Sequence, residues 1–199
     1  DSTFSGDGVV TTGIENSRSR GVSVDVQHDG KVLVAGFSVS EPILVRYNID
    51  GSIDTSFDDD GIVFIDPGST LDTVEELSIR ADGKIIVVGS RDLGVTYGEN
   101  YAVLDSSIAL MRYNSDGSVD NNFGDSGVIL TPVSNGYDVG KSISIQSDGK
   151  IVVAGESWAD HDNSGTVRDR FALVRYTENG SLDTSFGSGG IVTTEVGAD

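Results

Sequence analysis

Short apolar runs alternate with polar turns along this chain, and their spacing is that of β-strands. In residues 22–26, Val alternates with polar side chains, which is the period-2 pattern of a strand with one wet face. Residues 31–36 are almost continuously apolar, as expected of a strand covered on both faces. Asp29 and Gly30, between these runs, predict a two-residue type I′ hairpin with positive φ at both positions. No convincing amphipathic helix appears, so the sequence predicts an all-β fold.

The same phrase occurs three times and then begins a fourth time. It consists of Asp-x-x-Phe-x-x-x-Gly, an apolar strand, an alternating strand, Asp-Gly-Lys, a buried strand, and a strand that ends in Arg-Tyr. We divide a single repeat domain, 1–199, into repeats 1–53, 54–119 and 120–182 and a partial copy, 183–199. A unit of this length cannot bury its own apolar face and must stack on its neighbours.

Four antiparallel strands per unit describe a β-propeller blade. We therefore predict a β-propeller-like fold with about three four-stranded blades plus an extra closing strand from the partial copy. Because propellers usually have roughly four to eight blades, a longer chain or a second chain would complete the ring. A threefold trefoil or prism is the alternative. A fourth copy that has only its first strand would need a partner strand.

Three phrases in the chain resemble the bacterial delta-60 repeat. They are Gly-Ser-Ile-Asp-Thr-Ser-Phe at 51–57, Asp-Gly-Lys-Ile-Ile-Val-Val-Gly at 82–89 and Ala-Leu-Val-Arg-Tyr at 172–176. That family is predicted to form β-propeller blades in large secreted or surface proteins, and it has no settled biochemical function. The resemblance implies an extracellular scaffold or adhesive module. It transfers no catalytic residue.

The composition narrows the range of partners. Asp and Glu number 32 against 13 Lys and Arg, a net charge of −19, which argues against nucleic acid and anionic membrane surfaces. No apolar run approaches the roughly 18 residues that a membrane helix needs, so we expect no membrane insertion. The absence of Cys excludes disulfides and leaves oxygen ligands, which suit calcium. These features predict a secreted bacterial protein, extracellular or at the cell surface.

The turn after the Arg-Tyr strand is a first candidate calcium site. Its oxygen-bearing side chains alternate around a Gly, as at the start of a calcium loop. The candidate ligands are Asn48, Asp50, Asp54, Asn114, Asp116 and Asp120. The same residue types also cap their own turns without metal, and no bidentate acid stands at the twelfth position. The Asp of Asp-x-x-Phe could equally accept a bond from the preceding Arg, as Asp54 from Arg46, and we favour that role.

A second candidate site lies in the long loop between the third and fourth strands of the third copy, where the other copies lack its motif. Residues 160–165, Asp-His-Asp-Asn-Ser-Gly, match the first half of a calcium loop. The candidate ligands are Asp160, Asp162, Ser164 and Asp169. Because the twelfth position is Phe171, the closing acid would be Asp169, Glu156 or a residue from elsewhere. The alternative is a solvated acidic loop.

Aromatic residues beside this loop predict a ligand surface. Trp158 is the only tryptophan, and Tyr97 and Tyr101 lie in the matching loop of the second copy. Exposed aromatics beside carboxylates could stack on a sugar ring, so a glycan is a candidate partner. The alternative is that Trp158 packs between blades.

Catalysis has little support. His28 and His161 have no recognisable nucleophile context, and no Gly-rich phosphate loop precedes a helix. We expect a non-enzymatic repeat module for structure, adhesion or self-assembly, stabilised by calcium. The alternatives are a lectin-like propeller module and a glycosidase fragment. Besides a glycan, the expected partners are other blades of a longer chain, or the chain itself, pairing strand edges into dimers or filaments.

Overall fold

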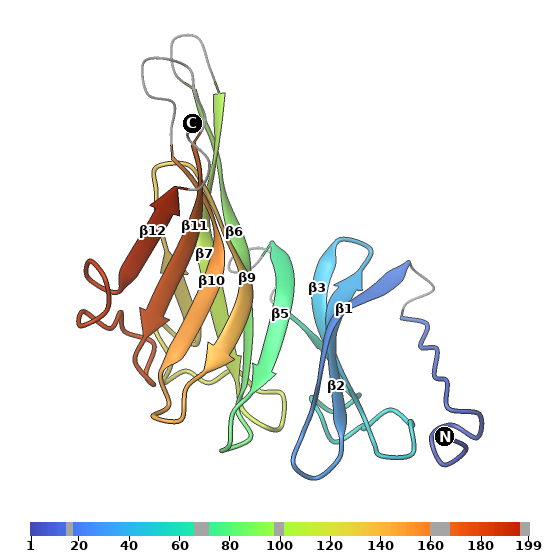
Figure 1. The fold of residues 1–199 in the computed structure, drawn as a ribbon. Coiled ribbons are helices and arrows are strands. Elements are labelled where there is room, and N and C mark those ends of the chain that lie inside the picture. Colours follow the sequence, from blue (N-terminus) through green and yellow to red (C-terminus); the bar gives the residue numbers. More distant parts are fainter. Residues whose placement is uncertain (15–17, 66–71, 98–101, 160–167, 196–199) are drawn as a thin grey trace.

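A computed structural model describes residues 1–14, 18–65, 72–97, 102–159 and 168–195, and the side chains of 96–97, 102–104, 159 and 168 are outside that description. Twelve strands and no helix occur in these ranges (Figure 1). They form three four-stranded antiparallel sheets, as predicted. Since no helix is present in the described ranges, none there is long and apolar enough to cross a membrane.

Each sheet is a meander in which neighbouring strands are consecutive in the chain. Blade 1 contains β1 (Ser19–Val26), β2 (Val32–Ser38), β3 (Glu41–Tyr47) and β4 (Ile62–Phe64). Blade 2 contains β5 (Thr73–Ile79), β6 (Ile85–Tyr97), β7 (Ala102–Tyr113) and β8 (Val128–Thr131). Blade 3 contains β9 (Tyr137–Ile145), β10 (Ile151–Ala159), β11 (Arg168–Tyr176) and β12 (Ile191–Glu195).

The hydrophobic core lies between the blades. The cluster between blades 1 and 2 includes Leu33, Ala35 and Leu44 from one sheet and Ile85, Val87 and Met111 from the other. The cluster between blades 2 and 3 includes Ile86, Val88 and Leu110 together with Ile151, Val153 and Val174. Blade 2 is therefore covered on both faces, and its residues 85–90 are all buried. In β10, buried and more exposed residues alternate instead, because blade 3 has only one neighbour.

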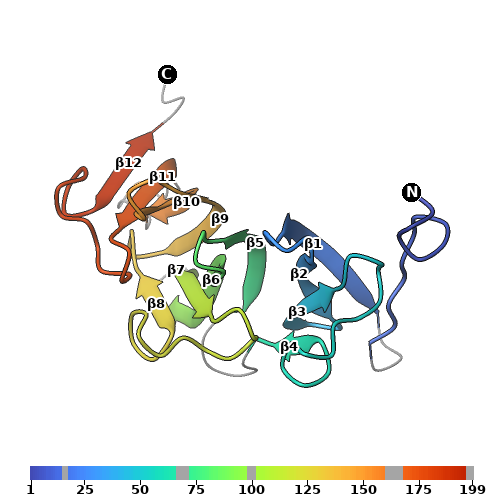
Figure 2. The same cartoon turned by 90° about the horizontal axis from the view of Figure 1, so that it is seen from below.

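The innermost strands β1, β5 and β9 lie side by side along one edge of the stack (Figure 2). Unpaired strand edges need hydrogen-bond partners, and side chains of the preceding blade supply them here. The amide of Ile79 donates to Asp25 Oδ2 at 2.9 Å, and the amide of Ile143 donates to Glu76 Oε2 at 2.7 Å. These bonds fix the inner edge of each blade to the next.

The strand that we expected to open each repeat instead closes the preceding blade. β4 pairs with β3, β8 pairs with β7, and β12 pairs with β11. The strand of the partial copy therefore completes blade 3, and the expectation that it would need a partner strand was wrong. The Asp-x-x-Phe turn reverses the chain, so the strand that follows lies antiparallel beside the one before. The matching run at 8–12 forms no strand.

The prediction of type I′ hairpins at Asp-Gly-Lys was also wrong. The amide of Gln27 donates to the carbonyl of Lys31, and the amide of Gly30 donates to the carbonyl of Gln27. Gly30 has φ +84°, whereas Asp29 is not among the residues with positive φ. The connection is thus a three-residue loop whose left-handed position is the glycine.

Candidate functional site

A buried ionic cluster closes blade 2 at the end of β7. Arg112 Nε donates to Asp120 Oδ2 at 2.7 Å, and Lys84 Nζ donates to the same oxygen at 2.6 Å. The guanidinium of Arg112 lies 4.2 Å from the centroid of the Phe123 ring, a cation–π contact. Arg112, Asp120 and Phe123 are all buried. We call this four-residue arrangement the clamp.

The clamp occurs in all three blades. Its members are Arg46, Asp54, Phe57 and Lys31 in blade 1, and Arg175, Asp183, Phe186 and Lys150 in blade 3. The Arg–Asp bonds measure 2.6 Å and 2.9 Å, and both guanidinium groups lie 4.5 Å from the ring centroid. The favoured sequence interpretation, in which Arg46 binds Asp54, agrees with this geometry.

The arginine of the clamp also reaches the next blade. Arg112 Nη1 donates to the carbonyl of Glu178 in blade 3 at 2.8 Å. Arg46 Nη1 donates to the carbonyl of Ser115, at the equivalent position of blade 2. Arg175 makes no bond to another blade within the described part of the chain; its Nη2 donates to Ser185 in its own turn. One guanidinium thus joins a turn of its own blade to a turn of the next.

The phenylalanine turn makes a second contact across the same boundary. The amide of Asp58 donates to the carbonyl of Asp116 at 3.0 Å, and the amide of Gly124 donates to that of Asn179 at 3.3 Å. Gly180 has φ +89°, and a Cβ there would lie 2.9 Å from Cε2 of Phe123. Glycine is therefore required at this turn both for its conformation and for the close approach of the ring.

The electrostatic environment keeps the clamp carboxylates ionised. Burial by itself raises the pKa of Asp120, but the hydrogen bonds from Lys84 and the amide of Asn122 and the charge of Arg112 together lower that pKa to about 2. In blade 3 the bonds from Ser185 and the charges of Arg175 and Lys150 lower the pKa of Asp183 to about 2. Carboxyls with such low pKa values hold no proton near neutral pH, so they are unsuited to general acid chemistry.

The turn residues predicted as calcium ligands bond to their own turns. Asp50 Oδ1 accepts the amide of Ser52 at 3.0 Å and its hydroxyl at 2.6 Å, which lowers the pKa of Asp50. Asn48 Nδ2 donates to the hydroxyl of Ser52. The turn of Asn114 and Asp116 repeats these bonds with Ser118. No group of three or more His, Cys, Asp or Glu that could hold a metal ion occurs in the described ranges.

Only part of the predicted ligand surface lies within the described residues. Trp158, at the end of β10, is 39% exposed, and its ring centroid lies 4.9 Å from that of Tyr137, with the planes tilted by 45°. Asp169 is exposed on β11 and pairs in register with Trp158. Four predicted site residues, Asp160, Asp162, Ser164 and Tyr101, lie outside the described ranges, as does the side chain of Tyr97.

Sequence reasoning missed two members of the clamp. We interpreted the lysine of Asp-Gly-Lys only as part of a hairpin, and the phenylalanine of Asp-x-x-Phe only as part of a turn. The available signal was that Lys, Arg, Asp and Phe recur in the same order in all three copies. Asp138 was also missed: it is buried near the start of β9 and accepts the amides of Val133 and Ser134.

A model of a β-propeller family, described as a domain of unknown function (DUF5122), matches residues 27–57, 105–123 and 146–186. Each matched stretch ends on the phenylalanine of a clamp, which is Phe57, Phe123 or Phe186. The chain has an all-β, β-propeller-like fold. The match favours the blade prediction over the threefold trefoil or prism.

Comparison of this propeller chain with solved structures gives weaker matches. A catalytically inactive virginiamycin B lyase from Staphylococcus aureus with quinupristin is 15% identical, with a TM-score of 0.33, and the alignment covers 94% of this chain and 74% of that one. The selenomethionine-substituted lyase from the same organism is 16% identical, with a TM-score of 0.30 and coverages of 88% and 70%. TM-scores below 0.5 do not establish a shared fold. A comparison with curated proteins gave no match.

Two equivalent arginines allow the contact between blades to be measured. Arg112→Lys keeps the charge but loses the stacking on Phe123 and the bond to Glu178, so we expect the free energy of unfolding to fall by about 2 kcal/mol. Arg175→Lys should cost less than about 1 kcal/mol, because among the described residues its guanidinium bonds only within blade 3. Urea denaturation of both variants checks this, and equal losses would contradict a role for Arg112 between blades.

The clamp also predicts a dependence of stability on pH. Because the folded pKa of Asp120 is lowered, its ionised form stabilises the fold above about pH 4, and that stabilisation is lost as the pH falls toward 2. The difference in unfolding free energy between the wild type and Asp120→Asn should shrink by about 2 kcal/mol between pH 5 and pH 2. A difference that stays constant over this range, in urea titrations at each pH, would contradict the assignment.

Proposed function

We propose that this chain is a non-enzymatic propeller module that serves as an extracellular or cell-surface scaffold for structure, adhesion or self-assembly. The proposal rests on one observation, namely which groups the repeated charged residues bind. The clamp carboxylates bind arginine and lysine, and the arginines of blades 1 and 2 bind the next blade. The recurring chemistry of the chain is thus directed at stacking blades.

The sequence supports the location and the class of module. The delta-60 resemblance implies large secreted or surface proteins, and the acidic, cysteine-free composition suits a secreted module that relies on ions instead of disulfides. Protease treatment of intact cells that express the natural protein should remove it if it lies at the surface. Persistence of the protein until the cells are lysed would contradict this location.

A turnover assay tests the non-enzymatic part of the proposal. The purified chain should release no product from polysaccharide, glycoside or ester substrates. Asp54→Asn and Asp120→Asn should lower the melting temperature, since each leaves a buried arginine without its carboxylate. Turnover that one carboxylate substitution abolishes without changing the melting temperature would overturn the proposal.

Calcium stabilisation belongs to the same proposal and rests on the sequence of the loop at 160–169. Millimolar calcium at a micromolar site should stabilise the fold by about 4 kcal/mol. The melting temperature should therefore fall with chelator, and Asp162→Ala should remove the effect. Asp116→Ala is the control, because its carboxylate bonds its own turn, and it should leave the calcium response intact. A melting temperature that chelator does not change would contradict calcium stabilisation.

A second candidate function is glycan binding, favoured by the half-exposed ring of Trp158 against Tyr137. A partly exposed aromatic pair of this kind can stack on a sugar ring. We expect Trp158→Ala to abolish binding on a glycan array, and Phe171→Ala, an exposed aromatic on the adjacent strand, to leave it unchanged. If the wild type binds no glycan on the array, glycan binding is contradicted as a function of this chain.

A further inference from the structure

The face of blade 3 that points away from blade 2 exposes apolar side chains whose counterparts in blades 1 and 2 are buried. Leu173 on β11 is 38% exposed, whereas Leu44 and Leu110, at the same position of blades 1 and 2, are fully buried against the next blade. Phe171 is 65% exposed, and its counterpart Ile108 is fully buried. We call this surface the leading face. The clamp arginine that crosses each boundary, here Arg175, belongs to it.

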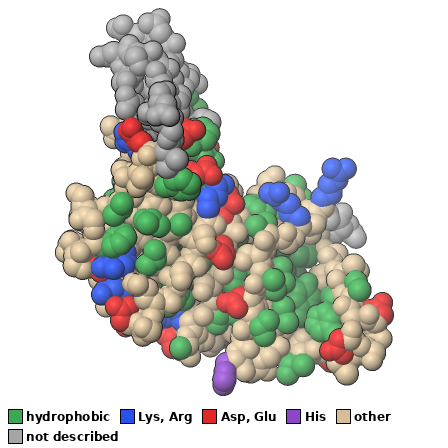
Figure 3. Space-filling model, viewed as in Figure 1, with side chains coloured by type: hydrophobic (Ala, Val, Ile, Leu, Met, Phe, Trp, Pro, Cys, Tyr) green, Lys and Arg blue, Asp and Glu red, His purple; other side chains and the backbone are tan. Residues whose placement is uncertain are grey.

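The opposite end of the stack carries the matching half. Val24 on β1 is 64% exposed, whereas its counterparts Leu77 and Ile143 are 3% and 7% exposed, because the preceding blade covers them. Hydrophobic side chains gather over β1 and β2, and a second group lies over β11 and β12 (Figure 3). We call the outer surface of blade 1, which includes Val24 and Val34, the trailing face.

Part of the trailing face is covered by the chain's own N-terminal segment, residues 1–14. Thr12 Oγ1 accepts the hydroxyl of Tyr47 at 2.8 Å, as Thr131 Oγ1 accepts that of Tyr176 at 2.8 Å in the contact between blades 2 and 3. Ile14 is buried with Ile43 and Val45. Residues 1–14 therefore contact blade 1 in the same way that the clamp turn and the outer strand of blade 2 contact blade 3.

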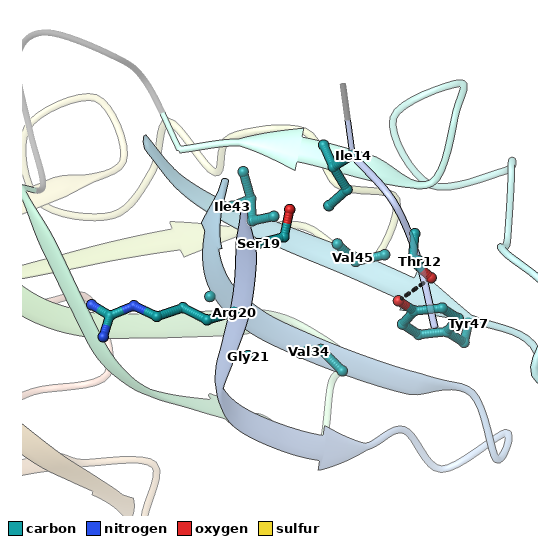
Figure 4. Close-up of a pocket in the computed structure, with 10 residues that line it drawn as sticks. Thr12, Ile14, Ser19, Arg20, Gly21, Val34, Ile43, Val45 and Tyr47 are labelled. Atoms are coloured by element: carbon teal, nitrogen blue, oxygen red, sulfur yellow. Dashed lines mark hydrogen bonds between the residues drawn. The ribbon is translucent and has the colours of Figure 1, made fainter. Parts of the chain in front are cut away.

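The main-chain contact of this segment is equivalent as well. The amide of Ser5 donates to the carbonyl of Asp50 at 2.8 Å, at the position where Gly124 binds Asn179. What the segment does not supply is the sheet of a preceding blade. A pocket remains beside it, lined by Ile14, Val34 and Val45 among others (Figure 4). The counterparts of Val34 and Val45 in blade 3, Val153 and Val174, are fully buried against blade 2.

We infer that the leading face of one copy docks on the trailing face of a second copy, head to tail, through the contact that already joins the blades within one chain. This inference rests on the proposed scaffold function and names its partner. Arg175 Nη1 would donate to the carbonyl of Ile49, which is the counterpart of Ser115 and Glu178. Leu173 and Phe171 would cover Val24 and Val34. A heterologous contact of this kind builds rings or filaments.

The N-terminal segment competes with such docking. In the docked pair, the amide of Gly187 would bind the carbonyl of Asp50, the acceptor that Ser5 now occupies. Phe186 would likewise take the place of the partner's Phe4 beside Gly51. Docking through the clamp turn therefore requires residues 1–14 to move from blade 1, and weakening their attachment should favour association.

Complementary surface variants of the full chain test this inference by sedimentation velocity. We expect association of the wild type that rises with concentration, and Phe4→Ala should lower its dissociation constant by about tenfold. Leu173→Asp blocks the leading face and Val24→Asp blocks the trailing face, so each variant alone should be monomeric. Mixed together, they should form a one-to-one dimer and nothing larger, because only one pair of faces is intact.

Leu130→Asp is the matched control, since Leu130 is an exposed leucine on β8 of the middle blade, and it should associate as the wild type does. Melting temperatures identify any variant that fails to fold. Two results would overturn the inference: a monomeric wild type that stays monomeric with Phe4→Ala, or association of either blocked variant alone. The turnover assay is independent of both results, so the failure of this inference and of the scaffold function are distinguishable.

Discussion

The rest of the structure depends on an arginine at the end of the third strand of each blade, which is buried in blades 1 and 2 and partly exposed in blade 3. The guanidinium binds the aspartate of its own turn and stacks on the phenylalanine three residues after that aspartate. In blades 1 and 2 it also binds a carbonyl of the next blade. Buried ion pairs contribute little net stability compared with apolar packing, but removing one partner is costly. The clamp therefore acts mainly to fix how one blade sits on the next.

Apolar burial supplies most of the driving force, and it is unevenly distributed. The middle blade has neighbours on both faces, so residues 85–90 of β6 are all buried. The outer blades each have one neighbour, and their outer faces keep exposed valine, leucine and phenylalanine side chains. In a repeat architecture, stability is approximately a sum of blade terms and interface terms. The apolar outer faces of blades 1 and 3 expose positions whose counterparts are buried between the blades inside the chain.

The periodic pattern predicted three four-stranded blades and the buried central strands, because alternation and apolar runs report directly on burial. It could not set the phase of the repeat, since a repeating phrase can be cut anywhere. Placing the strand after Asp183 in blade 3 required the pairing of β12 with β11. The pattern also could not predict that Lys84 binds Asp120, because 36 residues separate the two and only the folded blade brings them together.

A double-mutant cycle between Arg112 and Asp120 tests the central claim most directly. The unfolding free energies of Arg112→Ala, Asp120→Asn and the double variant would be measured by urea denaturation at pH 7. If the pair acts as one unit, the second substitution should cost much less than the first, with an interaction energy of about 1 to 3 kcal/mol. Additive losses, with an interaction energy below about 0.5 kcal/mol, would contradict the account.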